Sequence, residues 1–179
     1  MRDLMTVPSQ TMKDVPHPGP GHGDGLAAPL ATGLQALRHK NPYMAAGLIL
    51  SLMLGHKPFA DRSFGGMSRL IAGHVNRGHY RIIFRDGQPK GFVGWALTTP
   101  DAALAWRDGD GSTVGDGRHG EGAVVNFWVS DGPDMSSYIL RVLRSELSQT
   151  RLVTARRIYS DGRIRPVTIV NRRVDTMID

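Results

Sequence analysis

The chain has 179 residues, 40% of them hydrophobic and 21% charged, which is the composition of a single soluble globular domain. The absence of cysteine excludes disulfides, thiolate metal ligands and a cysteine nucleophile, and it agrees with a cytoplasmic location. No run reaches the roughly 18 apolar residues of a membrane span, and the start of the chain lacks the apolar core of a secretory signal.

The formal net charge of +6 is concentrated near the C-terminus. Nine arginines lie between Arg141 and Arg173, against two acidic residues, Glu146 and Asp161. Such a segment attracts an acidic partner, which is nucleic acid, a phosphate group or an acidic protein. The alternative is a solvated basic surface with no specific partner.

The beginning of the chain, residues 1–40, is predicted to be a flexible tail. Residues 1–27 are rich in proline and glycine and show no hydrophobic period, and a short helix is predicted around Ala28–Leu37. A single domain is then expected over residues 41–175. It begins with a buried helix, Pro42–Leu54, which has Asn41 as its cap and Gly55 as its stop.

A second helix is expected over Phe64–Val75, with His74 near its end for surface or packing reasons. A hairpin follows, in which the turn Asp86–Pro89 joins the strands Tyr80–Arg85 and Gly91–Leu97.

After this hairpin, the sequence predicts a short helix over Pro100–Trp106 and a glycine- and aspartate-rich loop over Arg107–Gly122. A buried strand over Ala123–Val129 and an amphipathic helix over Met135–Ser148 follow. The chain is predicted to close with a second hairpin, in which Ser160–Gly162 joins the strands Leu152–Tyr159 and Ile164–Val170. The loop lacks the glycine and the glutamate of a calcium-binding EF-hand, so a mobile loop is predicted and no metal site is expected. The order of elements predicts a mixed α/β (α+β) fold, whose sheet is mainly antiparallel and flanked by helices.

His56 is the strongest candidate for chemistry. It ends the most apolar stretch of the chain and opens a short polar loop, where a ring is partly desolvated and still open to substrate. The proton affinity of histidine suits a general base near neutral pH. The alternative is a packing residue at a helix end.

Taken in order, these elements resemble the toxin-activating lysine acyltransferases that mature RTX haemolysins and leukotoxins. The likeness covers roughly Asn41 to Arg173 and rests on the order and spacing of its pieces. The clearest pieces are the helix ending at His56, the segment Tyr80–Pro89, the strand end Gly94-Trp95-Ala96, the strand Val124–Val129 and the closing segment Ala155–Gly162.

This resemblance implies an acetyltransferase-like (GNAT-like) fold and a fatty acyl group that moves from acyl carrier protein to internal lysines of an RTX-type protoxin. The carrier-protein thioester is the acyl donor, no cofactor stays bound, and a homodimer is compatible with the family. His56 lies at the position of the family's catalytic histidine, where an imidazole can take the proton of a lysine ammonium before the amine attacks the thioester. The apolar side chains of Leu50, Leu54 and Phe59 could shelter the acyl chain.

Two residues depart from the family pattern. Asn126 stands in place of an aspartate, so it can orient an imidazole through its amide oxygen but supplies no full charge. Met53 stands where a serine is often found, and Ser51 is the nearest hydroxyl. Asn126 is therefore expected to be the catalytic partner of His56; the alternatives are Asp131 in that role, or a buried amide at 126 that pairs with backbone groups.

The basic C-terminal segment gains a partner under this resemblance, because acyl carrier proteins are acidic and carry a phosphopantetheine phosphate. The candidate contacts are Arg141, Arg144, Arg156 and Arg157.

Three other functions stay open. One is a weakened homologue that only binds carrier protein or toxin, and another is a small-molecule N-acyltransferase that uses coenzyme A. The stretch Arg118–Ala123 comes close to the pyrophosphate signature of acetyl-coenzyme-A transferases, but Glu121 replaces its first glycine. The third is a nucleic-acid-binding domain, which is disfavoured because Tyr138 and Tyr159 are the only aromatic residues among the C-terminal arginines.

Overall fold

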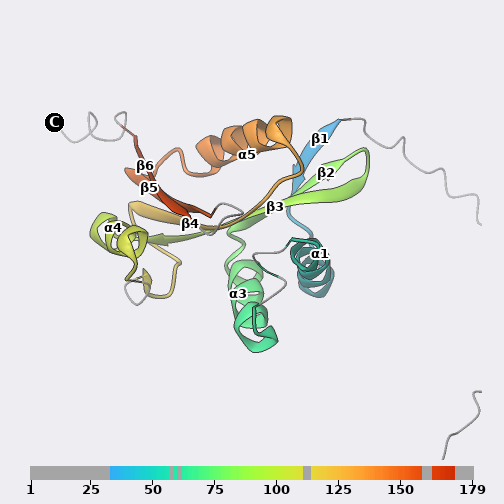
Figure 1. Ribbon diagram of the computed structural model, residues 1–179, viewed down its shortest axis with the longest axis horizontal. Coiled ribbons are helices and arrows are strands. Elements are labelled where there is room, and N and C mark those ends of the chain that lie inside the picture. Colours follow the sequence, from blue (N-terminus) through green and yellow to red (C-terminus); the bar gives the residue numbers. More distant parts are fainter. Residues whose placement is uncertain (1–32, 57–58, 60–61, 111–113, 159–162, 172–179) are drawn as a thin grey trace, which may run out of the picture.

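A six-stranded sheet with the strand order β1-β2-β3-β4-β5-β6 forms the centre of the protein (Figure 1). The computed structural model describes residues 33–56, 59, 62–110, 114–158 and 163–171. In chain order, the elements are β1 (Leu34–Leu37), α1 (Pro42–Leu54), α3 (Phe64–Arg77), β2 (Tyr80–Arg85), β3 (Gln88–Thr98), α4 (Pro100–Asp108), β4 (Gly122–Val129), α5 (Pro133–Glu146), β5 (Leu152–Ile158) and β6 (Ile164–Val170). All neighbouring strands are antiparallel except β4 and β5, which confirms the predicted α+β fold with a mainly antiparallel sheet.

Helices cover both faces of the sheet (Figure 1). Helix α5 packs on one face through Met135, Ile139 and Leu143. Helices α1, α3 and α4 lie on the other face, where Ile49 of α1 and Ile71 of α3 join one buried cluster. Among the described helices, none has the length and apolar composition that crossing a bilayer would require.

The predicted cap of α1 and the predicted hairpin turn between β2 and β3 are both present. The side-chain oxygen of Asn41 accepts hydrogen bonds from the backbone N–H groups of Tyr43 (2.9 Å) and Met44 (3.2 Å), which caps α1. The β2–β3 turn is shorter than predicted, because β3 already begins at Gln88. Asp86 and Gly87 have φ angles of 51° and 77°, the left-handed pair that suits a two-residue hairpin turn.

The helix predicted around Ala28–Leu37 is wrong for the part that the structure describes. Residues 34–37 form β1, which pairs antiparallel with β2 from Leu34↔Arg85 to Leu37↔Ile82. A strand forms here because the outer edge of β2 offers its backbone groups for pairing, a tertiary contact that outweighs local helix propensity. The predicted tail, residues 1–40, thus includes a strand of the sheet.

Several predicted features lie outside the described residues. They are residues 1–27 of the tail, the turn Ser160–Gly162 and the end of the domain beyond Asn171.

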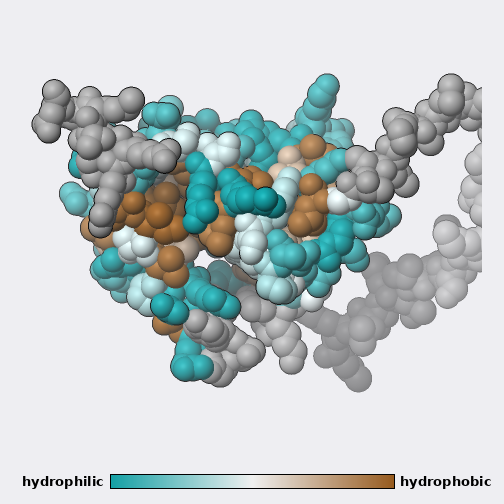
Figure 2. All heavy atoms as spheres, turned by 90° about the horizontal axis from the view of Figure 1, so that it is seen from above, coloured by the Kyte–Doolittle hydropathy of each residue, from teal (hydrophilic) through white to brown (hydrophobic). Residues whose placement is uncertain are grey.

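The last strand, β6, forms the edge of the sheet and exposes Ile164, Ile169 and Val170. Figure 2, seen from the side of α5, shows apolar residues gathered toward the β5–β6 side of the molecule. Pro166 lies within β6, and because it lacks an N–H group it is tolerated only at such an edge.

Strand β4 contains a bulge in its middle. Phe127 pairs with Gly94 and Val125 pairs with Trp95, so Asn126 has no partner residue on β3. Residues two apart on a regular strand share a face, yet Val125 packs under α5 whereas Phe127 packs with α1 and α3. Asn126 is therefore the inserted residue at which the strand changes phase.

The sheet also opens at this point. The parallel pairing of β4 with β5 ends at Val125↔Ala155, although β4 continues to Val129 and β5 to Ile158. The two strands therefore diverge directly beyond the bulge, and their facing backbone groups are not paired with each other.

Candidate functional site

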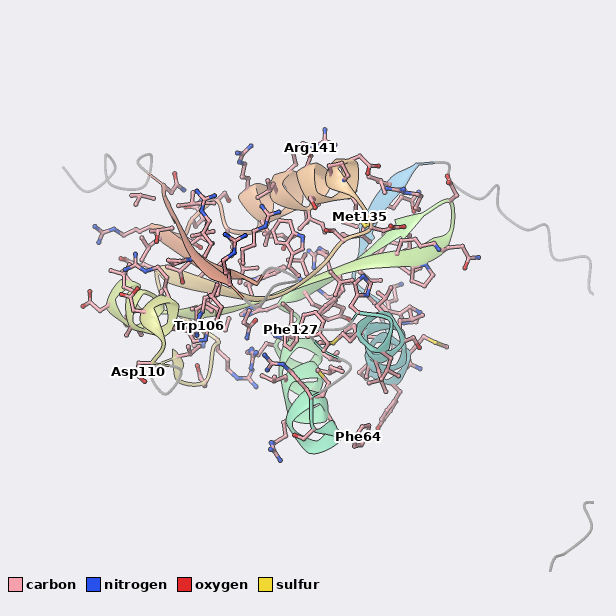
Figure 3. The ribbon with its side chains drawn as sticks, in the orientation of Figure 1. Phe64, Trp106, Asp110, Phe127, Met135 and Arg141 are labelled. Atoms are coloured by element: carbon pink, nitrogen blue, oxygen red, sulfur yellow. The ribbon has the colours of Figure 1, made fainter. Side chains whose placement is uncertain are left out.

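The loop after His56 lies against the strand that carries Asn126. Phe59, three residues beyond His56, packs on Phe127 with a distance of 5.4 Å between the ring centroids. Figure 3 shows Phe127 on the side of the sheet that faces α1 and α3. The structure thus brings the segments that carry the two predicted catalytic residues together, although no hydrogen bond among the described residues joins the His56 ring to Asn126.

The imidazole of His56 is half-buried and held by its own helix. Its Nδ1 lies 2.8 Å from the carbonyl oxygen of Leu52, the residue one helical turn earlier. Because a carbonyl only accepts, Nδ1 carries the hydrogen in this contact, and Nε2 of the neutral ring keeps its lone pair. The Leu52 carbonyl therefore orients the ring, and Nε2 is the atom that can take up a proton.

Asn126 presents an amide oxygen that is buried and unpaired. Among the described residues nothing donates a hydrogen bond to its Oδ1, so the backbone pairing considered for a buried amide is not found for this atom. Leaving a buried acceptor unsatisfied costs about 1–3 kcal/mol. Such a group suits a site whose hydrogen-bond donor arrives with a ligand or with water.

His74 is a buried polar residue of this region that the sequence did not indicate. Its ring lies directly over Gly94, where an added Cβ would be 3.0 Å from Nδ1, and meets Phe127 edge to face at 5.2 Å. Neither ring nitrogen has a hydrogen-bond partner among the described residues. Burial, and next the charge of Arg77, lowers the pKa of His74 to about 4, so the ring is neutral at physiological pH.

One sequence signal could have located His74. It lies three residues after Ile71 and seven after Met67, which places it on the buried stripe of α3. The sequence left a surface role and a packing role open for His74, and the structure shows it packed in the core.

Arg77 and His79 extend this polar region toward the loop before β4. Nη1 of Arg77 donates to the Asp116 carbonyl oxygen at 3.4 Å, and Nδ1 of His79 donates to the Gly117 carbonyl oxygen at 3.1 Å. The His79 ring also stacks on Trp95, with 6.1 Å between centroids and 10° between planes. Burial lowers the pKa of His79, the Gly117 carbonyl opposes this, and the charge of Arg77 lowers the pKa further.

The four predicted donor-binding arginines do not share one surface. Arg141 and Arg144 are exposed on α5, and Figure 3 shows Arg141 on the outer side of that helix. Arg156 lies over the ring of Trp106 on α4, which packs on the opposite face of the sheet, at 5.8 Å from the centroid. Arg157, the next residue of β5, is exposed.

The N-terminus of α5 lies next to the opening of the sheet and is already occupied by a carboxylate. Helix N-termini commonly bind phosphate through free N–H groups. Here Pro133 removes one N–H at the first helical position. Nη2 of Arg85 lies 2.6 Å from a carboxylate oxygen of Asp134, and the Met135 N–H, followed by Arg85, lowers the pKa of that carboxyl.

Two further candidate ligand sites are not formed among the described residues. The stretch Arg118–Ala123 leads into strand β4 at Gly122 and opens no helix, so it lacks the setting of a pyrophosphate loop. Among the described residues, no group of three or more His, Asp or Glu side chains is arranged to hold a metal ion.

Comparisons with known proteins identify the fold. No protein-family model matches the chain, and no curated protein matches its sequence. Among solved structures, a GNAT-like decarboxylase, GphF, in complex with isobutyryl-CoA matches with a TM-score of 0.54 and 15% identity, over 71% of this chain and 67% of that one. A malonyl-CoA decarboxylase from Rhodopseudomonas palustris matches with a TM-score of 0.38 and 14% identity, over 70% of this chain and 30% of that one. The first match confirms the acetyltransferase-like (GNAT-like) fold, and at this identity it extends to the fold alone.

Proposed function

We propose that the protein is a lysine N-acyltransferase that moves a fatty acyl group from acyl carrier protein to internal lysines of an RTX-type protoxin. One observation carries the proposal: the Leu52 carbonyl fixes Nδ1 of His56 as the protonated nitrogen and leaves Nε2 as a base, in a loop packed beside the opening of the sheet. The resemblance in the order and spacing of the elements supplies the substrate class.

The reaction follows from this base. Nε2 of His56 accepts a proton from the lysine ammonium, and the free amine attacks the thioester carbonyl. The attacking nitrogen of the tetrahedral intermediate releases its second proton to water. The intermediate then collapses with loss of the thiolate of the carrier arm, which takes the first proton back from the imidazolium. The products are a lysine amide and a free thiol, and His56 returns to its neutral form.

The opening between β4 and β5 suits the carrier arm. Beyond Val125 and Ala155 the facing edges of the two strands leave backbone N–H and C=O groups unpaired with each other. Pantetheine contains two amide groups in an extended chain, and such a chain pairs with an open strand edge. The unpaired amide of Asn126 lies at the start of this opening.

An apolar surface adjoins His56. Leu54 is 62% exposed at the end of α1, and Leu50 and Phe59 pack partly buried against the neighbouring core. These three residues offer a surface for the fatty chain while the thioester lies at the base.

The choice of donor rests on the resemblance. At the N-terminus of α5, Asp134 pairs with Arg85 and Pro133 lacks an N–H group, so this helix end by itself does not favour a diphosphate. A second candidate is an acyl-CoA-dependent acyltransferase, favoured by the fold likeness to a decarboxylase bound to isobutyryl-CoA.

The experiment measures covalent acylation by mass spectrometry. Wild-type protein, acyl carrier protein thioester and a lysine-containing fragment of an RTX-type protoxin should give a fatty amide, and an acyl-CoA thioester should replace the donor poorly. His56→Ala should abolish transfer, while His119→Ala, which removes an exposed histidine elsewhere, should not. Normal turnover by His56→Ala would show that His56 is not the base, and preference for acyl-CoA would favour the second candidate.

Asn126→Asp probes the unusual residue of the site. If the amide weakens the site, a carboxylate should raise the rate of transfer. A large loss would instead show that Asn126 has a role of its own, and complex formation without any transfer would indicate a homologue that only binds its partners.

A further inference from the structure

A cleft of about 520 Å³ lies where the link from β1 to α1 meets the end of α3. Figure 1 shows α1 and α3 on the same face of the sheet. The lining of this cleft includes Arg38, Lys40 and Arg77, and none of the described aspartates or glutamates lines it. A smaller cleft of about 320 Å³ beside His79 also includes Arg38, but it contains the carboxylate of Glu146. The larger cleft is therefore the more strongly cationic one.

The cations of the larger cleft form no ion pair with a described carboxylate. Among the described residues, no carboxylate oxygen lies within ion-pair distance of Arg38, Lys40 or Arg77. Burial, followed by the charge of Arg118, lowers the pKa of Arg77, and the charge of Asp116 opposes this shift. Like charges repel each other, so the convergence of Arg38, Lys40 and Arg77 is favourable when an anion binds between them.

The position of Arg38 depends on a glycine. Gly78 ends α3 with a φ of 71°, and an added Cβ would lie 3.0 Å from Nη1 of Arg38. The guanidinium therefore lies directly over the backbone at the end of α3, beside Arg77.

The cleft lies two strands away from the bulge. Tyr80 lines the cleft and pairs with Gly94, which in turn pairs with Phe127 beside Asn126. Two strand spacings separate Tyr80 from Phe127, which is roughly 10 Å. Both residues belong to the buried cluster between the sheet and helices α1 and α3.

We infer that this cleft, and not the C-terminal arginines, is where the acidic carrier protein docks, with its phosphopantetheine phosphodiester held by Arg38, Lys40 and Arg77. The inference rests on the proposed function, because it takes the donor to be a carrier protein. Guanidinium and ammonium groups donate charge-assisted hydrogen bonds to phosphate. An acidic protein around that phosphate complements a cleft that has several cations and no acid.

The test measures binding apart from catalysis. Arg38→Gln/Lys40→Gln removes two exposed cations from the cleft, and Arg69→Gln/Lys90→Gln removes two exposed cations elsewhere. The probe is a carrier protein bearing phosphopantetheine, titrated by fluorescence anisotropy at two salt concentrations. The cleft variant should bind at least about tenfold more weakly, with a smaller salt dependence, and the control should bind like wild type. Equal melting temperatures check the fold.

Further binding measurements distinguish docking at the cleft from docking elsewhere and from nucleic-acid binding. The carrier protein without its phosphopantetheine should bind wild type more weakly, because the phosphate is absent. If wild type binds the carrier protein and the cleft variant binds it equally well, this inference is overturned and the proposed function stands. The same holds if only Arg141→Gln/Arg144→Gln weakens the binding. No binding of the carrier protein by wild type overturns both. Tighter binding of a DNA oligonucleotide through the same residues overturns the assignment of the occupant.

Discussion

The buried ring of His74 predicts a loss of stability in acid. Burial and Arg77 lower its pKa in the folded protein from 6.5 to about 4. Between these values the unfolded chain binds a proton at this ring and the folded protein does not, so the free energy of unfolding falls as the pH decreases. Each pH unit in this window changes it by about 1.4 kcal/mol. The loss from His74 is therefore about 3 kcal/mol, complete near pH 4 and absent above pH 7.

Replacing the ring tests this argument. His74→Met keeps an apolar side chain of similar size over Gly94 and removes the titrating group. Urea unfolding followed by circular dichroism at several pH values between 4 and 8 gives the free energy of unfolding for both proteins. Wild type should lose about 3 kcal/mol more than the variant between pH 7 and pH 4, because His79 and the carboxylates remain in both. The same pH dependence in both proteins would refute the reasoning.

Further predictions concern packing around the site. Gly94→Ala should cost about 1–3 kcal/mol, because the new Cβ meets the His74 ring at 3.0–3.2 Å and the ring is enclosed; thermal unfolding measures the loss, and adding His74→Ala should relieve that clash. Gly47→Ala, in the exposed middle of α1 with nothing within 4 Å, should instead stabilise by about 0.5–1 kcal/mol, and a lower melting temperature would contradict this. Thr154→Val removes the hydrogen bond of 3.1 Å from Oγ1 to the Ala103 carbonyl and should cost about 1 kcal/mol in urea unfolding, and no change would show that the bond is not stabilising.

Elements with local signals were predictable. Asn41 and Pro42 mark the start of α1 by their own chemistry, and the Asp86-Gly87 turn forces β2 and β3 into a hairpin. The short strand β1 was not predicted because it forms through pairing with β2, a long-range contact. A sequence of four residues is too short to show the pattern of a strand by itself.

The site was only partly predictable, because its geometry depends on contacts between distant elements. His56 stood out as a histidine at a helix end, but its orienting contact is a backbone carbonyl, which every residue possesses. The bulge at Asn126 lies in a nearly continuous apolar run, which lacks the alternation that would reveal a change of phase.

The arginines show a related limit of sequence reasoning. The count of charges along the chain predicted that Arg141 and Arg156 contact the same partner, whereas the fold places them on opposite sides of the sheet. The cationic cleft is lined by both Arg38 and Arg77, which are 39 positions apart in the sequence. Neither residue lies in an unusually basic segment.

The bulge means that β4 carries one residue more than its core needs. If Asn126 were deleted, Val125 would still pack under α5, Phe127 would still pack with α1 and α3, and the two would then follow each other in the ordinary alternation of a strand. A protein that lacks this residue should therefore fold with an intact core on both faces of the sheet. The chain retains at this one place a side chain that its architecture can do without.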